Sequence, residues 1–266
     1  STRKTPSMRK TAWTTSTIVA LLLIITTPAA QTQSDTPVRP NREAPGEFQF
    51  VRLAYSSNSY GRGGYGRRQM WQTDWPDADY HFSRGVDRLT RVSVAEQGRI
   101  LTPLDEEIFD YPWIYAVEVG HWSLNEQEAE RMRAYLLRGG FLMVDDFHGT
   151  YEWAAFVASM ERVFPDRPII EIPESDAALH VVYDLDNRIQ IPSRMFLYSG
   201  TTYEKDGYTP HWRGIYDDDG RLMVAINFNM DIGDAWEHAD WPDYPENMTA
   251  LAYRFGINYL IYAMTH

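Results

Sequence analysis

The chain contains no cysteine among its 266 residues. Disulfide scaffolds, zinc–thiolate sites and iron–sulfur clusters all need cysteine side chains, so the sequence excludes each of them. A thiol nucleophile is excluded for the same reason. Oxygen and nitrogen side chains are therefore the candidates for any catalytic or metal-binding role.

Positive charge is scarce. The 25 Lys and Arg residues stand against 37 Asp and Glu residues, which gives a formal net charge of −12. This balance argues against a nucleic-acid partner, because neutralising phosphates requires a basic surface. Lys205 is the only lysine beyond residue 30, so no other lysine in that part of the chain could form a Schiff base or bind a nucleotide phosphate.

Long apolar runs are also missing. The run over residues 18–25 has eight residues, whereas a membrane-spanning helix needs about 20. It follows the basic pair Arg9 and Lys10 and precedes the small residues 28–30, which is the order of a secretory signal peptide. We therefore predict a signal peptide over residues 1–30, cleaved near Ala30, and export to the periplasm or the exterior of a bacterial cell. No stable membrane span is expected after cleavage.

Removing residues 1–30 would take away four basic residues and no acidic ones, leaving 21 basic and 37 acidic residues and a net charge of −16. Residues 31–46 are polar and rich in proline, which is typical of a flexible spacer. No internal repeat divides residues 47–266, so we expect them to form a single domain.

Hydrophobic patterns predict alternating strands and helices in this domain. A serine–glutamate capping box at Ser123 and Glu126 is predicted to begin a helix, with Gly139 placed at its carboxyl end. A predicted strand precedes this helix and another follows it, so the three form a βαβ unit with parallel strands. The predicted strands in this half are residues 48–55, 113–119 and 141–144, and a further helix covers residues 77–90.

The second half continues in the same way. We predict a helix over residues 152–163, a strand over 168–172, and a buried, largely apolar helix over 247–264. Residues 215–228 form a predicted hairpin whose turn is residues 217–220. The expected fold class is α/β, with a mostly parallel sheet and an antiparallel hairpin near the carboxyl terminus.

Polar side chains follow three of the predicted strands. Ligands of open parallel sheets bind beyond the carboxyl ends of the strands, so these side chains form a candidate ligand site. A divalent metal ion is the one cofactor candidate, with Asp145, His148 and Asp231 as ligands. The same groups could instead serve as acid and base in hydrolysis, or could simply cap the following helices. The candidate site comprises Glu118, His121, Asp145, Asp146, His148, Asp231, Asp234, Trp236 and Glu237.

The segment over residues 57–75 is rich in glycine, arginine and aromatic residues. It contains the spacing GxGxxG at residues 61–66, but no helix follows directly, so we interpret it as a loop rather than a dinucleotide site. Its cationic and aromatic side chains could form a lid that grips an anionic or sugar-like ligand. The lid residues are Arg62, Arg67, Arg68, Trp71 and Asp74.

Three motifs carry a resemblance to a known family: residues 71–79 (WQTDWPDAD), residues 138–147 (RGGFLMVDDF) with Gly149, and residues 227–237 (NFNMDIGDAWE). Together they resemble the bacterial family called domain of unknown function 4159, over residues 48–266. That resemblance implies a three-layer, flavodoxin-type fold related to class I glutamine amidotransferases. In those enzymes a cysteine occupies the turn after a central strand. The matching turn here, residues 145–149, has none, so glutaminase activity is not expected.

These observations favour an exported, amidotransferase-like domain that lacks the cysteine nucleophile and binds a small-molecule or glycan-like ligand. Two other interpretations remain open. One is a metal- or carboxylate-dependent hydrolase acting on a glycan or peptide of the cell envelope. The other is a structural protein whose acidic surface binds an envelope partner.

Overall fold

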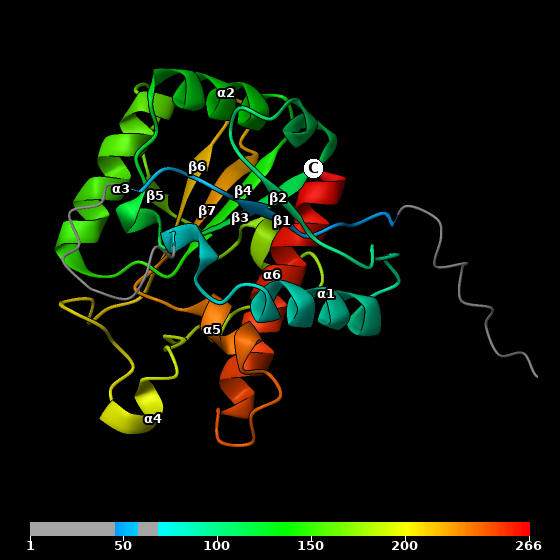
Figure 1. The fold of residues 1–266 in the computed structure, drawn as a ribbon, viewed down its shortest axis with the longest axis vertical. Helices are drawn as coiled ribbons and strands as arrows, with labels where there is room; N and C mark the ends of the chain where they lie inside the picture. The colour runs from blue at the N-terminus through cyan, green and yellow to red at the C-terminus, as the bar shows by residue number, and fades with distance from the viewer. Residues whose placement is uncertain (1–45, 58–68) are drawn as a thin grey trace, which may run out of the picture. The chain divides into compact units, whose positions relative to one another are not determined.

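The computed structural model describes residues 46–57 and 69–266, which belong to the unit Pro40–His266 (Figure 1). The predicted signal peptide and nearly all of the predicted spacer lie outside these residues. A seven-stranded sheet has the order β2-β1-β3-β4-β7-β6-β5. Strand β6 is antiparallel to β5 and β7, and all other neighbouring pairs are parallel. The strands are β1 (Val51–Leu53), β2 (Arg99–Leu101), β3 (Trp113–Val117), β4 (Phe141–Asp145), β5 (Ile170–Glu171), β6 (His211–Tyr216) and β7 (Leu222–Phe228).

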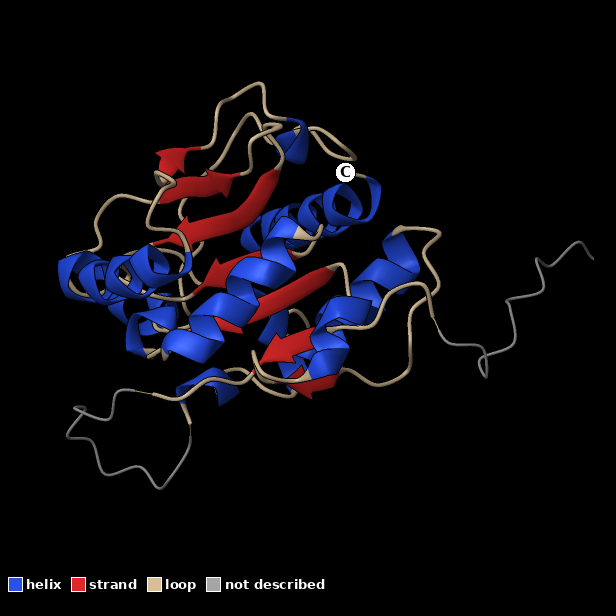
Figure 2. Cartoon of the chain, turned by 90° about the horizontal axis from the view of Figure 1, so that it is seen from above, coloured by secondary structure: helices blue, strands red, loops and turns tan. Residues whose placement is uncertain are grey.

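Helices lie on both sides of this sheet, as Figures 1 and 2 show. Short 3-10 helices lie between the longer elements: η1 (Met70–Gln72), η2 (Glu106–Asp110), η3 (Val119–His121) and η4 (Ala177–Leu179). The α-helices are α1 (Asp77–Leu89), α2 (Glu126–Leu137), α3 (Gly149–Val163), α4 (Phe196–Ser199), α5 (Ile232–Glu237) and α6 (Glu246–Thr265).

The central strands β3, β4 and β7 are buried along their whole length. Side chains alternate between the two sides of a strand, so each strand contributes to two hydrophobic cores. In β3, for example, Tyr115 faces the core formed with α1, α5 and α6, whereas Ile114 faces the core formed with α2 and α3. Burial on both sides explains why these strands read as continuous apolar runs.

The structure confirms the α/β class, the mostly parallel sheet and the antiparallel strands near the carboxyl terminus. It shortens the strands predicted over residues 48–55 and 113–119, because β1 covers only three residues and β3 ends at Val117. The predicted capping box was wrong by two residues. Asn125 accepts the backbone N–H of Glu128 at 3.0 Å, and Glu128 accepts the N–H of Asn125 at 2.8 Å, so α2 begins after Asn125.

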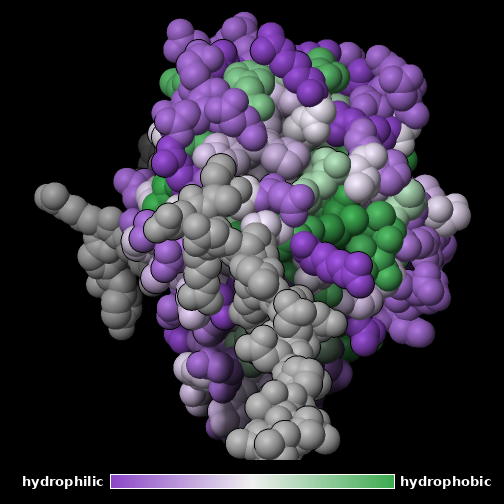
Figure 3. Space-filling model, turned by 90° about the vertical axis from the view of Figure 1, so that its right-hand side faces the viewer, coloured by the Kyte–Doolittle hydropathy of each residue, from purple (hydrophilic) through white to green (hydrophobic). Residues whose placement is uncertain are grey.

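The surface seen in Figure 3 is mostly hydrophilic, with a large hydrophobic area right of centre and smaller ones near the top. Within residues 46–57 and 69–266, none of the helices is both long enough and apolar enough for a membrane crossing.

Candidate functional site at the carboxyl edge of the sheet

The carboxyl ends of the three central strands share an unusual backbone geometry. Each strand is followed at once by a residue with positive φ: Glu118 (φ 53°) after β3, Asp146 (φ 52°) after β4 and Asn229 (φ 62°) after β7. A left-handed conformation costs a non-glycine residue about 1–2 kcal/mol, with asparagine and aspartate the most tolerant. Such strained residues are common at functional sites, so this edge of the sheet is a candidate functional site.

Main-chain hydrogen bonds hold the three turns together. The N–H of Glu118 donates to the carbonyl of Asp145, and the N–H of Asp146 donates to the carbonyl of Met230, both at 3.1 Å. The N–H of Asn229 donates to the carbonyl of Phe147, also at 3.1 Å. The turn geometry is therefore fixed by backbone contacts between neighbouring strands.

Three buried carboxylates meet beside these turns, and we call Asp74, Asp146 and Asp231 the inner cluster. One carboxylate oxygen from each lies within 4.8 Å of the others. The residues are only 6%, 6% and 4% exposed, respectively. Burial and the nearby carboxylates of Asp146 and Asp234 hold the pKa values of Asp74 and Asp231 well above the ordinary aspartate range. Burial also raises the pKa of Asp146, although His148 opposes this.

Asp74 reaches this cluster because Arg52 on β1 holds the preceding segment. The buried Arg52 guanidinium donates to the carbonyls of Trp71 at 3.1 Å and Thr73 at 2.9 Å. The same side chain pairs with Asp79 on α1, with Nε 2.9 Å from Oδ1. Asp74 Oδ2 is buried and has no hydrogen-bond partner among the described residues. An oxygen in this state is open to a ligand.

Gly233 at the start of α5 makes room for that oxygen. A Cβ atom at this position would lie 2.5 Å from Asp74 Oδ2 and 2.6 Å from the Tyr115 hydroxyl. A side chain there would displace one of these groups. The absence of a side chain at residue 233 is therefore a requirement of the inner cluster.

Asp145 has a different role from the predicted one of metal ligand. Its Oδ2 accepts the N–H groups of Ile232 at 2.7 Å and Gly233 at 2.8 Å, and the Tyr115 hydroxyl at 3.2 Å. Asp145 thus anchors the amino end of α5, so the capping role weighed from the sequence applies, but to another helix than α3. Burial and Asp146 raise the pKa of Asp145 well above its usual value.

His148 also differs from its predicted role as a ligand in the set Asp145, His148 and Asp231. Its Nε2 lies 3.1 Å from Asp146 Oδ1, so it contacts one member of the inner cluster. The three oxygens that the structure brings together instead belong to Asp74, Asp146 and Asp231. The predicted set thus shares only Asp231 with the inner cluster.

A second group, the outer cluster, comprises Glu118, His121, Glu152 and Lys205. His121 Nε2 lies 2.9 Å from Glu152 Oε1 and 3.5 Å from Glu118 Oε2. Lys205 Nζ also contacts Glu152 Oε1, and the Lys205 side chain is 47% exposed. The outer cluster therefore extends from buried Glu152 to solvent.

The pKa values of the two carboxylates in the outer cluster are shifted in opposite directions. Burial and the carboxylates of Asp146 and Glu152 raise the pKa of Glu118 well above its usual value. Burial acts in the same direction on Glu152, but hydrogen bonds from His121, Lys205 and the His148 backbone outweigh it and lower its pKa to about 2. The surroundings thus favour the protonated form of Glu118 and the ionised form of Glu152.

A third group lies on α5 and its carboxyl end, and we call Asp234, Glu237 and His238 the α5 cluster. One ligand atom from each lies within 4.8 Å of the others. Trp236, predicted to flank the ligand site, points elsewhere. It is fully buried in the hydrophobic core, with its ring centroid 4.3 Å from that of Phe82.

The predicted lid is divided by the limits of the described residues. Arg62, Arg67 and Arg68 lie outside them. Trp71 is a half-buried residue of η1, and Asp74 is a member of the inner cluster. Sequence reasoning also missed Glu152, Lys205 and His238. Of these, Lys205 could have been identified as a candidate from the sequence, because it is the only lysine beyond residue 30.

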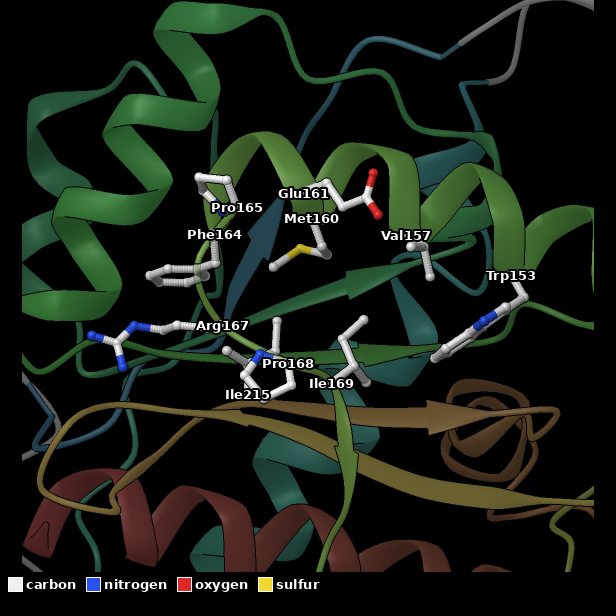
Figure 4. A pocket seen from close by; sticks show the side chains of 10 residues that line it. All are labelled: Trp153, Val157, Met160, Glu161, Phe164, Pro165, Arg167, Pro168, Ile169 and Ile215. Carbon is white, nitrogen blue, oxygen red and sulfur yellow. The ribbon is translucent and has the colours of Figure 1, made fainter.

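A separate groove of about 340 Å³, lined by apolar side chains together with Glu161 and Arg167, lies between α3 and Ile215 of β6 (Figure 4). Met160 and Phe164 line it from the α3 side. Within the described part of the chain, its lining includes no member of the inner, outer or α5 clusters.

None of the curated proteins compared with this chain matches it. Residues 49–264, most of the chain, match the sequence profile of a family described as Domain of unknown function (DUF4159). The chain with the left-handed turns and buried carboxylates described above is therefore a member of the DUF4159 family.

Proposed function

We propose that this protein is an exported binding domain whose inner cluster holds a divalent cation and whose outer cluster receives an oxygen-bearing ligand. The observation that carries the proposal is the meeting of three buried carboxylates, with Asp74 Oδ2 lacking a hydrogen-bond partner in the described residues. Three adjacent negative charges in a low-dielectric site require either protons or a cation.

The burial of the inner cluster limits the size of what it can bind directly. Its members are at most 6% exposed, so a sugar or peptide cannot contact them without rearrangement, whereas a bare cation can. Oxygen ligands on opposite sides of Ca²⁺ are about 5 Å apart, and closer around Mg²⁺. The three oxygens lie within 4.8 Å of one another, which fits Ca²⁺, whereas Mg²⁺ requires separations of no more than about 4.2 Å. An all-carboxylate set favours hard cations such as Ca²⁺, Mg²⁺ or Mn²⁺.

The outer cluster suits a larger ligand because its side chains reach the surface. Lys205 supplies a cation, and protonated Glu118 supplies a hydrogen-bond donor. A ligand carrying a carboxylate or several hydroxyl groups would satisfy both. This arrangement supports the small-molecule or glycan-like class of ligand.

The proposal has two further parts. One is that the domain is related to amidotransferase-like, flavodoxin-type proteins, and the other is that the chain is exported. Asp146 supports the first, because it takes a left-handed conformation on the turn between β4 and α3, where the resemblance places a cysteine. The basic, apolar and small-residue order of residues 1–30 supports the second.

A titration of chelator-treated protein with Ca²⁺, Mg²⁺ and Mn²⁺ tests the cation site. We expect saturable binding and, at 100 times Kd, stabilisation by about 2.7 kcal/mol. Asp146→Asn keeps the left-handed backbone, since asparagine tolerates it, and should weaken binding at least about tenfold. Without cation, this variant should be as stable as the wild type or more so, because one of three crowded ionisable groups is gone.

Asp219→Asn is the matched control, because Asp219 is an exposed aspartate in the turn between β6 and β7. It should bind cations like the wild type. Equal cation responses in Asp146→Asn and the wild type, or no saturable response in either, would contradict the proposal.

Hydrolysis is a second candidate function, favoured by one observation. Glu118 and Glu152 lie in one cluster with pKa values moved in opposite directions. Such a pair provides an acid and a base at the same pH. In this case Glu118 would protonate the leaving group and Glu152 would accept a proton from the attacking water.

A further inference from the structure

We propose that the α5 cluster is a second metal site, formed by Asp234, Glu237 and His238 and suited to a borderline cation such as Zn²⁺. The site goes beyond the cation and ligand sites proposed above and uses none of their residues. Its positions on α5 are i, i+3 and i+4, which places the three side chains on the same side of the helix.

The imidazole of His238 points at the two carboxylates without a hydrogen bond to satisfy it. Its Nε2 lies 3.2 Å from Asp234 Oδ1 and 3.1 Å from Glu237 Oε2. Yet Nε2 has no hydrogen-bond partner in residues 46–57 and 69–266, and His238 is only 3% exposed. A buried nitrogen close to two oxygens but aligned with neither is the arrangement expected around a shared cation.

Neighbouring groups hold the three residues of the α5 cluster in place, as residues that contact the metal ligands do in known metal sites. The N–H of Arg194 donates to Asp234 Oδ2 at 2.6 Å, so Oδ1 is the oxygen left beside His238. The His238 ring stacks on Trp241 with 4.1 Å between centroids. His81 Nδ1 lies 3.0 Å from the carbonyl of Glu237, which ties the end of α5 to α1.

The donor set distinguishes this site from the inner cluster. One imidazole nitrogen and two carboxylate oxygens suit Zn²⁺, Mn²⁺ or Fe²⁺, whereas the inner cluster has only oxygens. The two sites should therefore prefer different cations.

The test is Zn²⁺ calorimetry on chelator-treated protein, together with NMR of the Co²⁺-loaded protein, in which a ligating imidazole gives a strongly shifted resonance. We expect His238→Gln to lower Zn²⁺ affinity about 10–100-fold and to remove the shifted resonance. Asp146→Asn removes a nearby carboxylate but no ligand of this site, so it should change Zn²⁺ affinity much less than His238→Gln does. Failure of this inference is thus separable from failure of the inner cation site.

His180→Gln is the matched control, because His180 and Asp184 form an exposed i, i+4 pair at 3.0 Å. It should leave Zn²⁺ binding unchanged. If His238→Gln does not fold, Glu237→Gln tests the same site at a partly exposed position. Wild-type Zn²⁺ affinity in the folded His238 or Glu237 variant, or loss of Zn²⁺ binding in Asp146→Asn alone, would overturn the inference.

Discussion

Asp231 has two roles that act oppositely on its charge. Its Oδ1 accepts the N–H of Asp234 at 2.8 Å and so caps α5, where a helix amino end favours an anion. Burial and the carboxylates of Asp146 and Asp234 favour the neutral acid, and they prevail, because the pKa of Asp231 is well above its usual value. Without a cation, the inner cluster therefore retains protons that the unfolded chain would release.

The retained protons determine whether the stability of the folded protein rises or falls with pH. The inner-cluster aspartates have a higher pKa in the folded protein than in the unfolded chain. Their contribution to the free energy of unfolding is therefore complete below the unfolded pKa of about 4 and is lost as the pH rises through the folded pKa. We expect the free energy of unfolding of chelator-treated protein to fall as the pH rises above about 4. Asp231→Asn preserves the cap and should reduce this slope by up to about 1.4 kcal/mol per pH unit.

Denaturant unfolding at several pH values measures the slope, with Asp219→Asn as the control. A slope unchanged by Asp231→Asn would show that Asp231 is ionised in the folded protein at neutral pH.

At the scale of elements, α5 links the parts of the site. Its amino end is anchored by Asp145 from β4, and its carboxyl end is tied to α1 by His81. Asp231 at its start belongs to the inner cluster, and His238 at its end belongs to the α5 cluster. A helix of six residues has little stability of its own, so these anchors determine its position.

Two substitutions at Asp145 separate its anchoring contacts from its charge. Asp145→Asn keeps an oxygen for the N–H groups of Ile232 and Gly233 and should change the free energy of unfolding by less than about 1 kcal/mol. Asp145→Ala leaves those buried donors without an acceptor and should cost about 3 kcal/mol. Equal effects of the two variants in chemical denaturation would argue against the anchoring role.

The sequence predicted the larger elements well because their patterns are long. Helices α1, α3 and α6 and the hairpin lie within a few residues of their predicted positions. Helix α5 was not predicted, because six residues are too few to show the helical spacing of apolar side chains. The sequence assigned residues 227–237 to a polar strand end instead.

The structure brings some of the predicted site residues together and leaves others apart. Asp146 and Asp231 follow neighbouring strands, and the rule for parallel sheets places both at one edge. Asp74 was assigned to a lid because nothing in its local sequence reveals the contacts of Arg52 with the Trp71 and Thr73 carbonyls. The contact of the Asp145 side chain with the backbone of Ile232, 87 residues away along the chain, could not be predicted from local sequence.

At the scale of the whole molecule, excess negative charge is the leading property. The net charge is −12 for the chain and −16 without residues 1–30. Several of these charges meet at one edge of the sheet, where they are stable only with protons or cations. Export would expose that edge to the cations of the cell exterior, so the proposed location and the proposed cation site support each other.

The proposed export gives a direct prediction for the mature chain. Expression in a bacterial host with a periplasm should yield a secreted form that begins close to Gln31, as read by intact mass or N-terminal sequencing. A variant with Leu21→Asp and Leu23→Asp interrupts the apolar run and should retain its amino terminus, because the exporting machinery reads that run. An uncleaved wild-type chain in the exported fraction would contradict the prediction.

The backbone bonds between the three turns also bear on how such a site evolves. The position of residue 146 is set by its N–H bond to Met230 and by the bond from Asn229 to Phe147, and neither uses the side chain at residue 146. Any residue that accepts a φ of 52° would be presented at the same point. The chemistry at the end of β4 is therefore open to replacement by single mutations while the scaffold stays constant, which would let related sequences acquire different reactions at an unchanged position.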